Sequence, residues 1–316
     1  MRVYSKIDFL KRLEERSINL FFEPALTNES LTSWICRNAL SSYSDPKQFV
    51  SYWLNAHAAV HYDFDHKPID ELNQWIIKYS PKRFSEESVS KNLNSLYQAF
   101  KYAKTVLPPV IVNGTRNKQN IHRPQFCPKC LNSNKPYFKL DWKFSMIFGC
   151  SNCGCFLATE CFYCQNPQQL MKLIFLRKNH FTSINECNFC HNSLSDSKTK
   201  LLTKSEIKLN NWITEIIGLK AIESQNPIKA SLLLDLCNVI SSNNPMGKIL
   251  REYFGIRIPE QSFGTMNPIN RIVVIKAAKK WIDAFYQITL EINDRYNINR
   301  RHWRSFINFP EDNIHP

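Results

Sequence analysis

The chain has 316 residues, of which 43% are hydrophobic, so it is long enough for two or three domains with apolar cores. Only 7 residues are glycine and no Walker A or G-x-G-x-x-G string occurs, which argues against a Gly-rich phosphate loop. No apolar run approaches about 18 residues, so no membrane span is expected. The formal charge of +14 predicts a polyanionic partner, DNA or RNA, with scattered surface lysine as the alternative.

Two short helices are predicted near the N-terminus. The first begins at Asn28, which can cap it, and carries apolar residues at helical spacing. The second begins at Asp45, followed by Pro46 and by a glutamine in a capping-box arrangement. Two helices joined by the turn 41–44 are typical of a helix-turn-helix, although a helical hairpin that touches no DNA fits this pattern equally well.

Further helices are predicted after this pair. Asp70 caps a candidate helix that ends at Ser80-Pro81, and another runs from about Ser85 to before Pro108. The polar stretch 113–120 then reads as a linker or an exposed connection. These features predict an N-terminal helical domain over residues 1–120.

Nine of the eleven cysteines lie between residues 127 and 190, and eight of these nine form four C-x-x-C pairs. A tetrahedral zinc ion takes two such pairs, so the sequence predicts two closed sites of four thiolates each. The sequential assignment of ligands is Cys127, Cys130, Cys150 and Cys153 for the first site, and Cys161, Cys164, Cys187 and Cys190 for the second. Cys155 is left over, and a buried free thiol is expected there rather than an exchanging ligand.

Other uses of these cysteines are less favoured. Disulfides need an oxidising compartment, and Met1 to Lys6 lack the apolar region of a secretory signal, so we expect the cytoplasm. Residues 187–191 fit the C-x-x-C-H string of haem attachment, but they have three similar neighbours. A redox dithiol would be one pair, and a catalytic zinc would keep an open position beside an acid or base. The metals are therefore predicted to be structural.

The predicted zinc module spans residues 121–195. Residues 137–142 and 144–148 are predicted to be hairpin-length strands, and residues 168–176 a helix inserted within the second site. Such short elements bury little surface, whereas a structural zinc contributes on the order of 10 kcal/mol of folding free energy. We expect this region to stay unfolded without metal.

The C-terminal part, residues 196–316, is predicted to be entirely helical. Helices are expected over 207–219, 228–240 and 246–254, followed by a long helix that Pro268 opens and that continues to Leu290. The predicted fold class is therefore mainly α with small β: an N-terminal helix-turn-helix region, a central double zinc-ribbon-like module and a C-terminal helical domain.

Basic residues are concentrated towards the end of the chain. Lysine and arginine interleaved with aromatic residues suit contacts to a nucleic-acid backbone or to a partner, although a solvated cationic face gives the same pattern. The candidate contact residues are Arg271, Lys276, Lys279, Lys280, Arg300, Arg301 and Arg304.

Two segments together resemble the TniQ family, target-site selectors of bacterial transposons. The first is Pro24 with residues 29–39 (ESLTSWICRNA), similar to the family's "P…ESLxSWLxRxA". The second covers residues 123–164 and is similar to the family's "CPxCL…W…CxxHGxxLxxxCPxC" array. One departure is Cys153, which stands where the family usually has histidine and which ligates zinc equally well.

The resemblance implies a cytoplasmic bacterial adaptor without a catalytic centre. Family members recognise a target and recruit an AAA+ transposition regulator, and those that dock on a guide-RNA complex often do so as homodimers. Some read target DNA directly, and others dock on a CRISPR guide-RNA complex (Cascade) and share its target. Members that read DNA directly tend to be longer, which favours a Cascade-bound adaptor of a CRISPR-associated transposon.

Two other functions remain open at this stage. A sequence-specific, zinc-containing DNA-binding regulator, not tied to CRISPR, would use the same helix-turn-helix and zinc ribbons. A zinc-dependent nucleic-acid enzyme, such as a nuclease or deaminase, is disfavoured because no acid/base motif accompanies the saturated thiolate sites.

Overall fold

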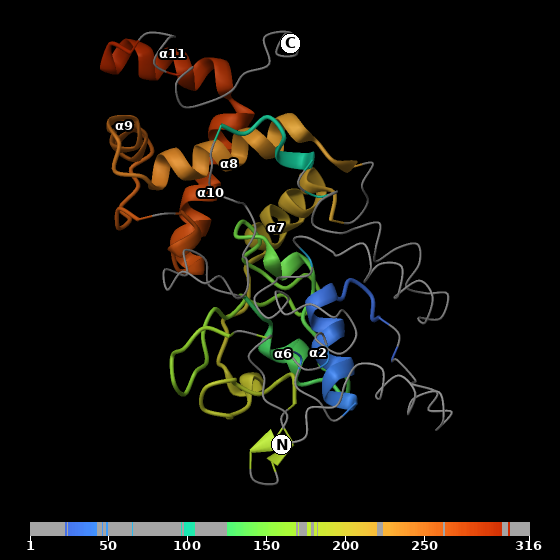
Figure 1. Cartoon of the computed structure of the whole chain (residues 1–316). Helices are drawn as coiled ribbons and strands as arrows, with labels where there is room; N and C mark the ends of the chain where they lie inside the picture. The colour runs from blue at the N-terminus through green and yellow to red at the C-terminus, as the bar shows by residue number, and fades with distance from the viewer. Residues whose placement is uncertain are drawn as a thin grey trace.

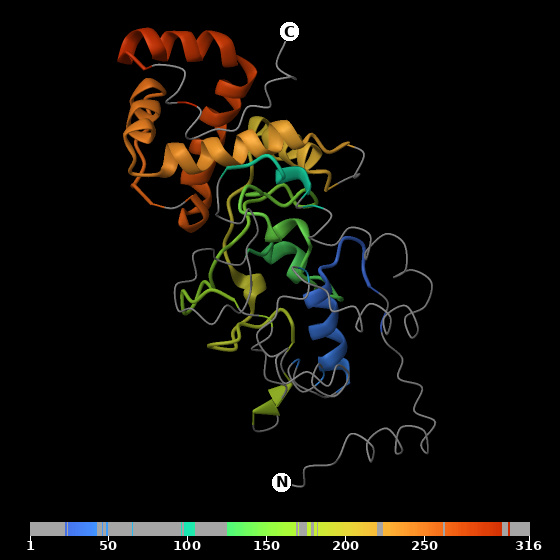
Figure 2. The same ribbon diagram turned by 45° about the horizontal axis from the view of Figure 1, so that its top comes forward.

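The computed structural model describes residues 23, 25–42, 46, 49, 65, 96, 98–104, 125–168, 170, 176–177, 180–181, 183–219, 224–261, 263–298 and 303. Within these ranges the fold is mainly helical with little strand, as predicted. The helices are α2 (Leu31–Ser41), α6 (Pro128–Leu131), α7 (Lys204–Ile217), α8 (Pro227–Ser241), α9 (Pro245–Tyr253), α10 (Pro268–Asp283) and α11 (Phe285–Tyr296). The antiparallel strands β1 (Leu176–Arg177) and β2 (His180–Phe181) lie at the opposite end of the molecule from α11 (Figures 1 and 2).

The C-terminal helices begin where their capping residues dictate. Helices α8, α9 and α10 each start at an Asn-Pro pair, whose asparagine side chain accepts a hydrogen bond from a first-turn N–H and whose proline fits the first helical position. Helix α7 begins with a capping box formed by Thr203 and Glu206. The predicted long helix from Pro268 to Leu290 is wrong in one respect, because it divides at Ala284 into α10 and α11.

Helix α8 is the centre of the C-terminal region. It packs against α7, α9 and α10, and it is buried on nearly all sides (Figure 1). At the far end of α10, the Trp281 ring packs against Phe285 and Trp303 at centroid distances of 4.5 and 5.5 Å. An apolar core of this kind needs no metal to explain its stability.

A segment from much earlier in the chain completes this core. The short 3-10 helix η2 (Gln98–Phe100) lies along α8 (Figure 1). The Tyr102 N–H donates to Ser231 Oγ at 3.2 Å, and the Lys104 N–H donates to both carboxylate oxygens of Asp235 at 3.0 Å. Residues 98–104 are therefore structurally part of the C-terminal region.

The region from 125 to 203 has little regular secondary structure. The predicted strands 137–142 and 144–148 are wrong: residues 141–143 form the 3-10 helix η3 (Asp141–Lys143), and pairing is limited to isolated bridges. The physical reason is burial, because Met146, Ile147 and Phe148 are all buried, whereas a half-buried strand would alternate. The predicted helix 168–176 is also wrong at Leu176, which belongs to β1.

Helix α2 is nearly enclosed by the rest of the protein. Its N-cap is Ser30 rather than the predicted Asn28, which has a left-handed backbone with φ 59°. The carboxylate of Asp65 accepts a hydrogen bond from the Leu31 N–H at 2.5 Å and forms a buried ion pair with Lys143. The predicted partner helix from Asp45 lies largely outside the described residues, so the helix-turn-helix stays a prediction. The predicted helix that Asp70 caps, residues 85–95 of the helix predicted from about Ser85 to before Pro108, and the linker 113–120 also lie outside them. The second of these helices is wrong over its described C-terminal part, because residues 98–100 form the 3-10 helix η2 and residues 101–104 are not helical.

The described helices include none that is both long enough and apolar enough to cross a membrane.

Candidate metal centres

Three of the four C-x-x-C pairs form the same turn. In the turns that begin at Cys150, Cys161 and Cys187, the N–H of the first cysteine donates to the carbonyl five residues on. The N–H four residues on donates back to the carbonyl of that cysteine, and all six bonds measure 2.8 to 3.0 Å. The residue after each second cysteine (Gly154, Gln165 or His191) has a left-handed backbone with φ between 57° and 61°. This repeated turn, which we call the knuckle, points both thiols of a pair the same way.

The fourth pair is built differently. Cys127 is the N-cap of α6, and its Sγ accepts a hydrogen bond from the Cys130 N–H at 3.4 Å. Pro128 at the first helical position favours this one-turn helix.

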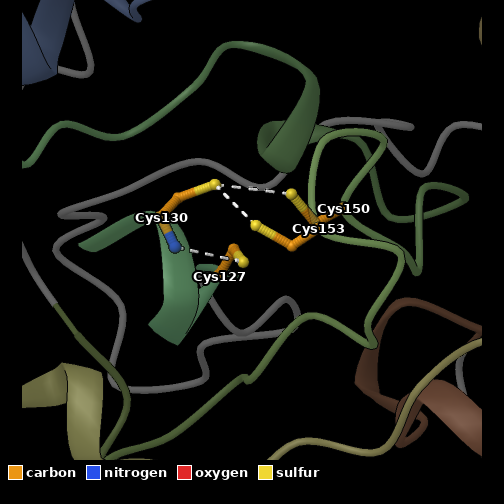
Figure 3. Close-up of side chains that lie close together, drawn as sticks. All are labelled: Cys127, Cys130, Cys150 and Cys153. Carbon is orange, nitrogen blue, oxygen red and sulfur yellow. Dashed lines mark hydrogen bonds between the residues drawn. The ribbon is translucent and has the colours of Figure 1, made fainter. Parts of the chain in front are cut away.

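The first centre brings together Cys127, Cys130, Cys150 and Cys153 (Figure 3). Their sulfur atoms all lie within 4.8 Å of one another, and Cys130 Sγ is 3.5 Å from both Cys150 Sγ and Cys153 Sγ. One helical cap and one knuckle thus converge on a single point from opposite sides of the centre.

The second centre brings together two knuckles. Cys161 Sγ is 3.6 Å from Cys190 Sγ, and Cys164 Sγ is 3.6 Å from Cys187 Sγ. Gln168 Nε2 donates to Cys187 Sγ at 3.2 Å, and Asn192 Nδ2 donates to Cys190 Sγ at 3.5 Å. Donors aimed at sulfur stabilise the thiolate form that a metal requires.

Both groups fit a tetrahedral metal ion. With Zn–S bonds of about 2.3 Å, the sulfurs of a four-thiolate zinc site are about 3.8 Å apart. The sulfur–sulfur distances of 3.5 to 3.6 Å in the two groups are close to this value. Burial raises the pKa of the Cys161 thiol to about 12, so without a cation this group keeps its proton. A cation that replaces the protons removes that penalty.

The two centres are joined to each other and to the helical region. The 3-10 helix η5 (Leu194–Asp196), which follows the second centre, contacts α6 of the first. The Leu202 N–H donates to the Gly154 carbonyl at 2.8 Å, directly before α7 begins. The first group of four cysteines is therefore hydrogen-bonded, through Gly154, to the residues that lead directly into α7.

Cys155 lies beside the first centre. It is buried, and its Sγ is 3.5 Å from Cys127 Sγ, but it does not belong to the group of four. In its knuckle it occupies the place that Asn166 and Asn192 take in the other two. Cys36 and Cys237 are buried in helices α2 and α8.

The predicted basic contact residues have different environments. Lys276 and Lys280 are exposed on α10, whereas Lys279 is half-buried, pairs with Asp283, and lies 4.9 Å from the Trp212 ring centroid. Arg300, Arg301 and Arg304 lie outside the described residues.

Arg271 is a correction to the prediction, because it is only 1% exposed and cannot meet a surface partner. Its Nη1 donates to the Ser145 carbonyl and its Nη2 to Gln125 Oε1. These bonds link α10 to residues 125–203, which hold both cysteine groups and which we call the metal-binding region. Burial lowers its pKa to about 10, so it stays charged at neutral pH.

Sequence reasoning did not identify two features of the second centre. Gln168 and Asn192 donate hydrogen bonds to its sulfur atoms. The signal for Asn192 was its position five residues after Cys187, which Asn166 repeats five residues after Cys161. The exposed aromatic residues within its C-x-x-C pairs were also not identified.

Comparison with known families gives one match. A family model described as TniQ matches residues 20–157, a span that contains α2 and the whole first centre and ends before the second. No curated protein and no solved structure matches the chain.

Proposed function

We propose that this chain, which carries a TniQ domain over residues 20–157, is a non-enzymatic adaptor that links a target-recognition complex to an AAA+ transposition regulator. Membership of the TniQ family implies a role in target selection for transposition. The proposed target-recognition complex is a guide-RNA Cascade complex, or target DNA read directly, and the proposed site of action is the bacterial cytoplasm as a homodimer.

The observation that carries the non-enzymatic part of this proposal is the closure of both metal centres. Each centre offers four thiols to one ion, so a zinc ion bound there has no open position for water or substrate. We propose two structural Zn²⁺ ions per chain, held by the cysteines of the two groups. Their role is to hold the irregular region 125–203 in one conformation.

The charge of the chain supports a nucleic-acid-containing partner. Lys276 and Lys280 are exposed on the same helix. Three further predicted contact residues, Arg300, Arg301 and Arg304, follow later in the sequence. Phosphate contacts from such residues strengthen association and make it sensitive to salt. The same observation favours the second candidate, a sequence-specific DNA-binding regulator not tied to CRISPR.

Co-purification separates the two functions. The full chain should co-elute with a guide-RNA complex and should retain the AAA+ regulator in a pull-down that depends on both metal ions. A chain that shifts one duplex sequence by itself, and that ignores the guide-RNA complex, would instead support the DNA-binding regulator. Hydrolysis or deamination of nucleic acid by the zinc-loaded chain would contradict both.

A charge-matched pair of variants tests the role of α10. Lys276→Gln with Lys280→Gln should weaken association with the nucleic-acid partner and reduce its dependence on salt by about two phosphate contacts. Lys229→Gln with Lys248→Gln removes the same charge from exposed positions on α8 and α9 and should have little effect. An equal loss of nucleic-acid affinity in both double variants would show that the net charge of the chain, and not the position of these lysines, determines binding.

A further inference from the structure

Three aromatic side chains are exposed at the second metal centre. Phe162 and Tyr163 are each 52% exposed, and Phe189 is 44% exposed. Phe162 and Tyr163 are the two residues between Cys161 and Cys164, and Phe189 lies between Cys187 and Cys190. All three therefore stand on the outer turns of the two knuckles, and we call them the aromatic knuckle surface.

The knuckle itself does not require aromatic residues. The knuckle of the first centre has the same backbone hydrogen bonds, yet its two intervening residues are Ser151 and Asn152, both exposed. The rings of the second centre are likewise outside the core, so packing does not explain them. Exposed rings of this size carry a hydration cost of about 25 cal/mol per Å² of apolar surface, which a ligand would remove.

Two of the three rings are held in position by contacts with their neighbours. Phe162 and Tyr163 make an edge contact with centroids 5.5 Å apart and planes at 79°. Tyr163 Oη donates to Asp196 Oδ2 at 3.0 Å, which anchors that ring to η5. Because these contacts order Phe162 and Tyr163 before binding, little conformational entropy is lost when a ligand stacks on them.

A basic side chain lies beside one of the rings, and the sequence around the two knuckles is basic. Lys198 Nζ lies 5.9 Å from the centroid of the Phe162 ring, and Lys200 is exposed nearby in sequence. Residues 161–200 carry five basic residues (Lys172, Arg177, Lys178, Lys198 and Lys200) against two acidic ones (Glu186 and Asp196), a net charge of +3. Arg177 stands in β1, within the insertion between the two knuckles.

We propose that the aromatic knuckle surface binds single-stranded nucleic acid. Unpaired bases stack on Phe162, Tyr163 and Phe189, while backbone phosphates lie near Lys198. Paired bases of a duplex present no free face to these rings, so the surface selects unpaired strands. The positive charge favours a polyanion over an apolar protein surface. This inference rests on the second centre alone and does not depend on the function proposed above.

A graft of the first knuckle onto the second tests the proposal. The variant Phe162→Ser, Tyr163→Asn and Phe189→Asn gives the second centre tips like those of the first. With the full, zinc-loaded chain, fluorescence anisotropy would follow binding of a 12-mer oligo-uridine RNA, a 12-mer oligo-thymidine DNA and a duplex of equal length. The graft should weaken single-strand binding about tenfold or more and leave duplex binding unchanged, because each lost base stack is large enough for such a change.

Two controls make the result specific. Leu290→Ser replaces an equally exposed apolar residue, 61% exposed on α11, and should leave all three affinities unchanged. Lys198→Gln should weaken binding less and should lower its salt dependence, whereas the graft should preserve that dependence. Two bound metal ions per chain in every variant would show that the centres remain intact.

The proposal is overturned if the graft binds single strands as tightly as the parent chain does. It is also overturned if the parent prefers the duplex or binds neither single strand. If the graft loses only association with a protein partner, the surface is a protein interface instead. Loss of transposition targeting without loss of oligonucleotide binding would concern the adaptor function and not this surface.

Discussion

The metal-binding region 125–203 and the helical region 204–298 obtain their order in different ways. In the helical region, each of α7, α8, α9 and α10 begins at a side-chain cap and buries an apolar face against its neighbours. Among the described residues of the metal-binding region, strand pairing is limited to isolated bridges and one two-stranded hairpin, and the chain converges on two groups of thiols. Local sequence therefore specifies the helices. The conformation of region 125–203 depends instead on cysteine pairs that are distant from one another in the sequence.

Metal removal should separate the two regions most clearly. A chelator should release two ions per chain and unfold region 125–203, because each structural zinc contributes on the order of 10 kcal/mol. Limited proteolysis should then cut within 125–203, while far-UV circular dichroism retains much of the helical signal.

Cysteine variants assign this effect to the centres. Cys161→Ser should leave one metal ion per chain, measured by elemental analysis. Cys237→Ala alters a buried cysteine of α8 and should retain both ions. A metal-free protein that keeps its protease resistance would contradict the prediction.

Trp281→Ala should weaken the helical region without affecting metal content. The side chain is fully buried between Phe285 and Trp303, and its removal should cost about 3–5 kcal/mol of unfolding free energy. Urea unfolding followed by circular dichroism measures this cost. Leu290→Ala, at an exposed site, should change stability by less than about 0.5 kcal/mol.

Arg271→Met should uncouple the two regions. The change leaves Gln125 Oε1 and the Ser145 carbonyl without this donor. We expect this to lower the free energy of unfolding by about 2–3 kcal/mol. Unfolding monitored at each region should give two separate midpoints. Arg251→Met is the matched control, since its bonds to Ile240, Ser242 and Glu260 lie within the helical region. If Arg271→Met keeps a single midpoint, coupling runs through other contacts.

Asp141 should give the metal-binding region an unusual pH dependence. Burial raises the pKa of this carboxyl from 3.8 to about 6, so between these values the folded state binds more protons than the unfolded state. The protonated Asp141 carboxyl is therefore tolerated in the folded state at low pH, and the protein loses stability as pH rises towards 6 and this group ionises. Asp141→Asn should remove this dependence and add about 3 kcal/mol to the free energy of unfolding at pH 7. Chemical unfolding at several pH values with metal in excess tests this, and a parallel profile for both proteins would contradict it.

Thr203→Ala should have the smallest effect, at the boundary between the regions. It removes one half of the capping box of α7, which costs about 1 kcal/mol. Thr203→Ser keeps the hydroxyl and should restore most of the stability in thermal unfolding. An alanine variant as stable as the parent would show that the Leu202 backbone bond alone positions α7.

The sequence predicted what local chemistry determines. The helix starts predicted at residues 207, 228, 246 and 268 lie within three residues of the observed starts of α7 to α10, and the spacing of cysteines predicted both groups of thiols. The division at Ala284 was not predictable, because neither proline nor glycine marks it. Consecutive apolar residues at 146–148 were interpreted as a strand, although they are all buried in a segment that forms no strand.

Arg271 shows how a basic residue was misplaced. It was grouped with Lys276 and Lys280 by composition, yet it shares the helical stripe of Ile275 and Ala278, both buried. Its helical position, four and seven residues before buried neighbours, was the signal for an interior side chain. The match to a TniQ model confirmed the resemblance that the N-terminal and cysteine motifs indicated.

The contact between residues 98–104 and α8 has a practical consequence for dissecting the protein. A fragment cut at residue 196 would leave α8 without η2 and would deprive Asp235 of the Lys104 N–H, beside an uncovered apolar surface. Such a fragment should be poorly soluble alone, and a synthetic peptide spanning 96–104 should rescue it when added in trans. The boundaries of an expressible unit thus follow spatial neighbours rather than stretches of contiguous chain.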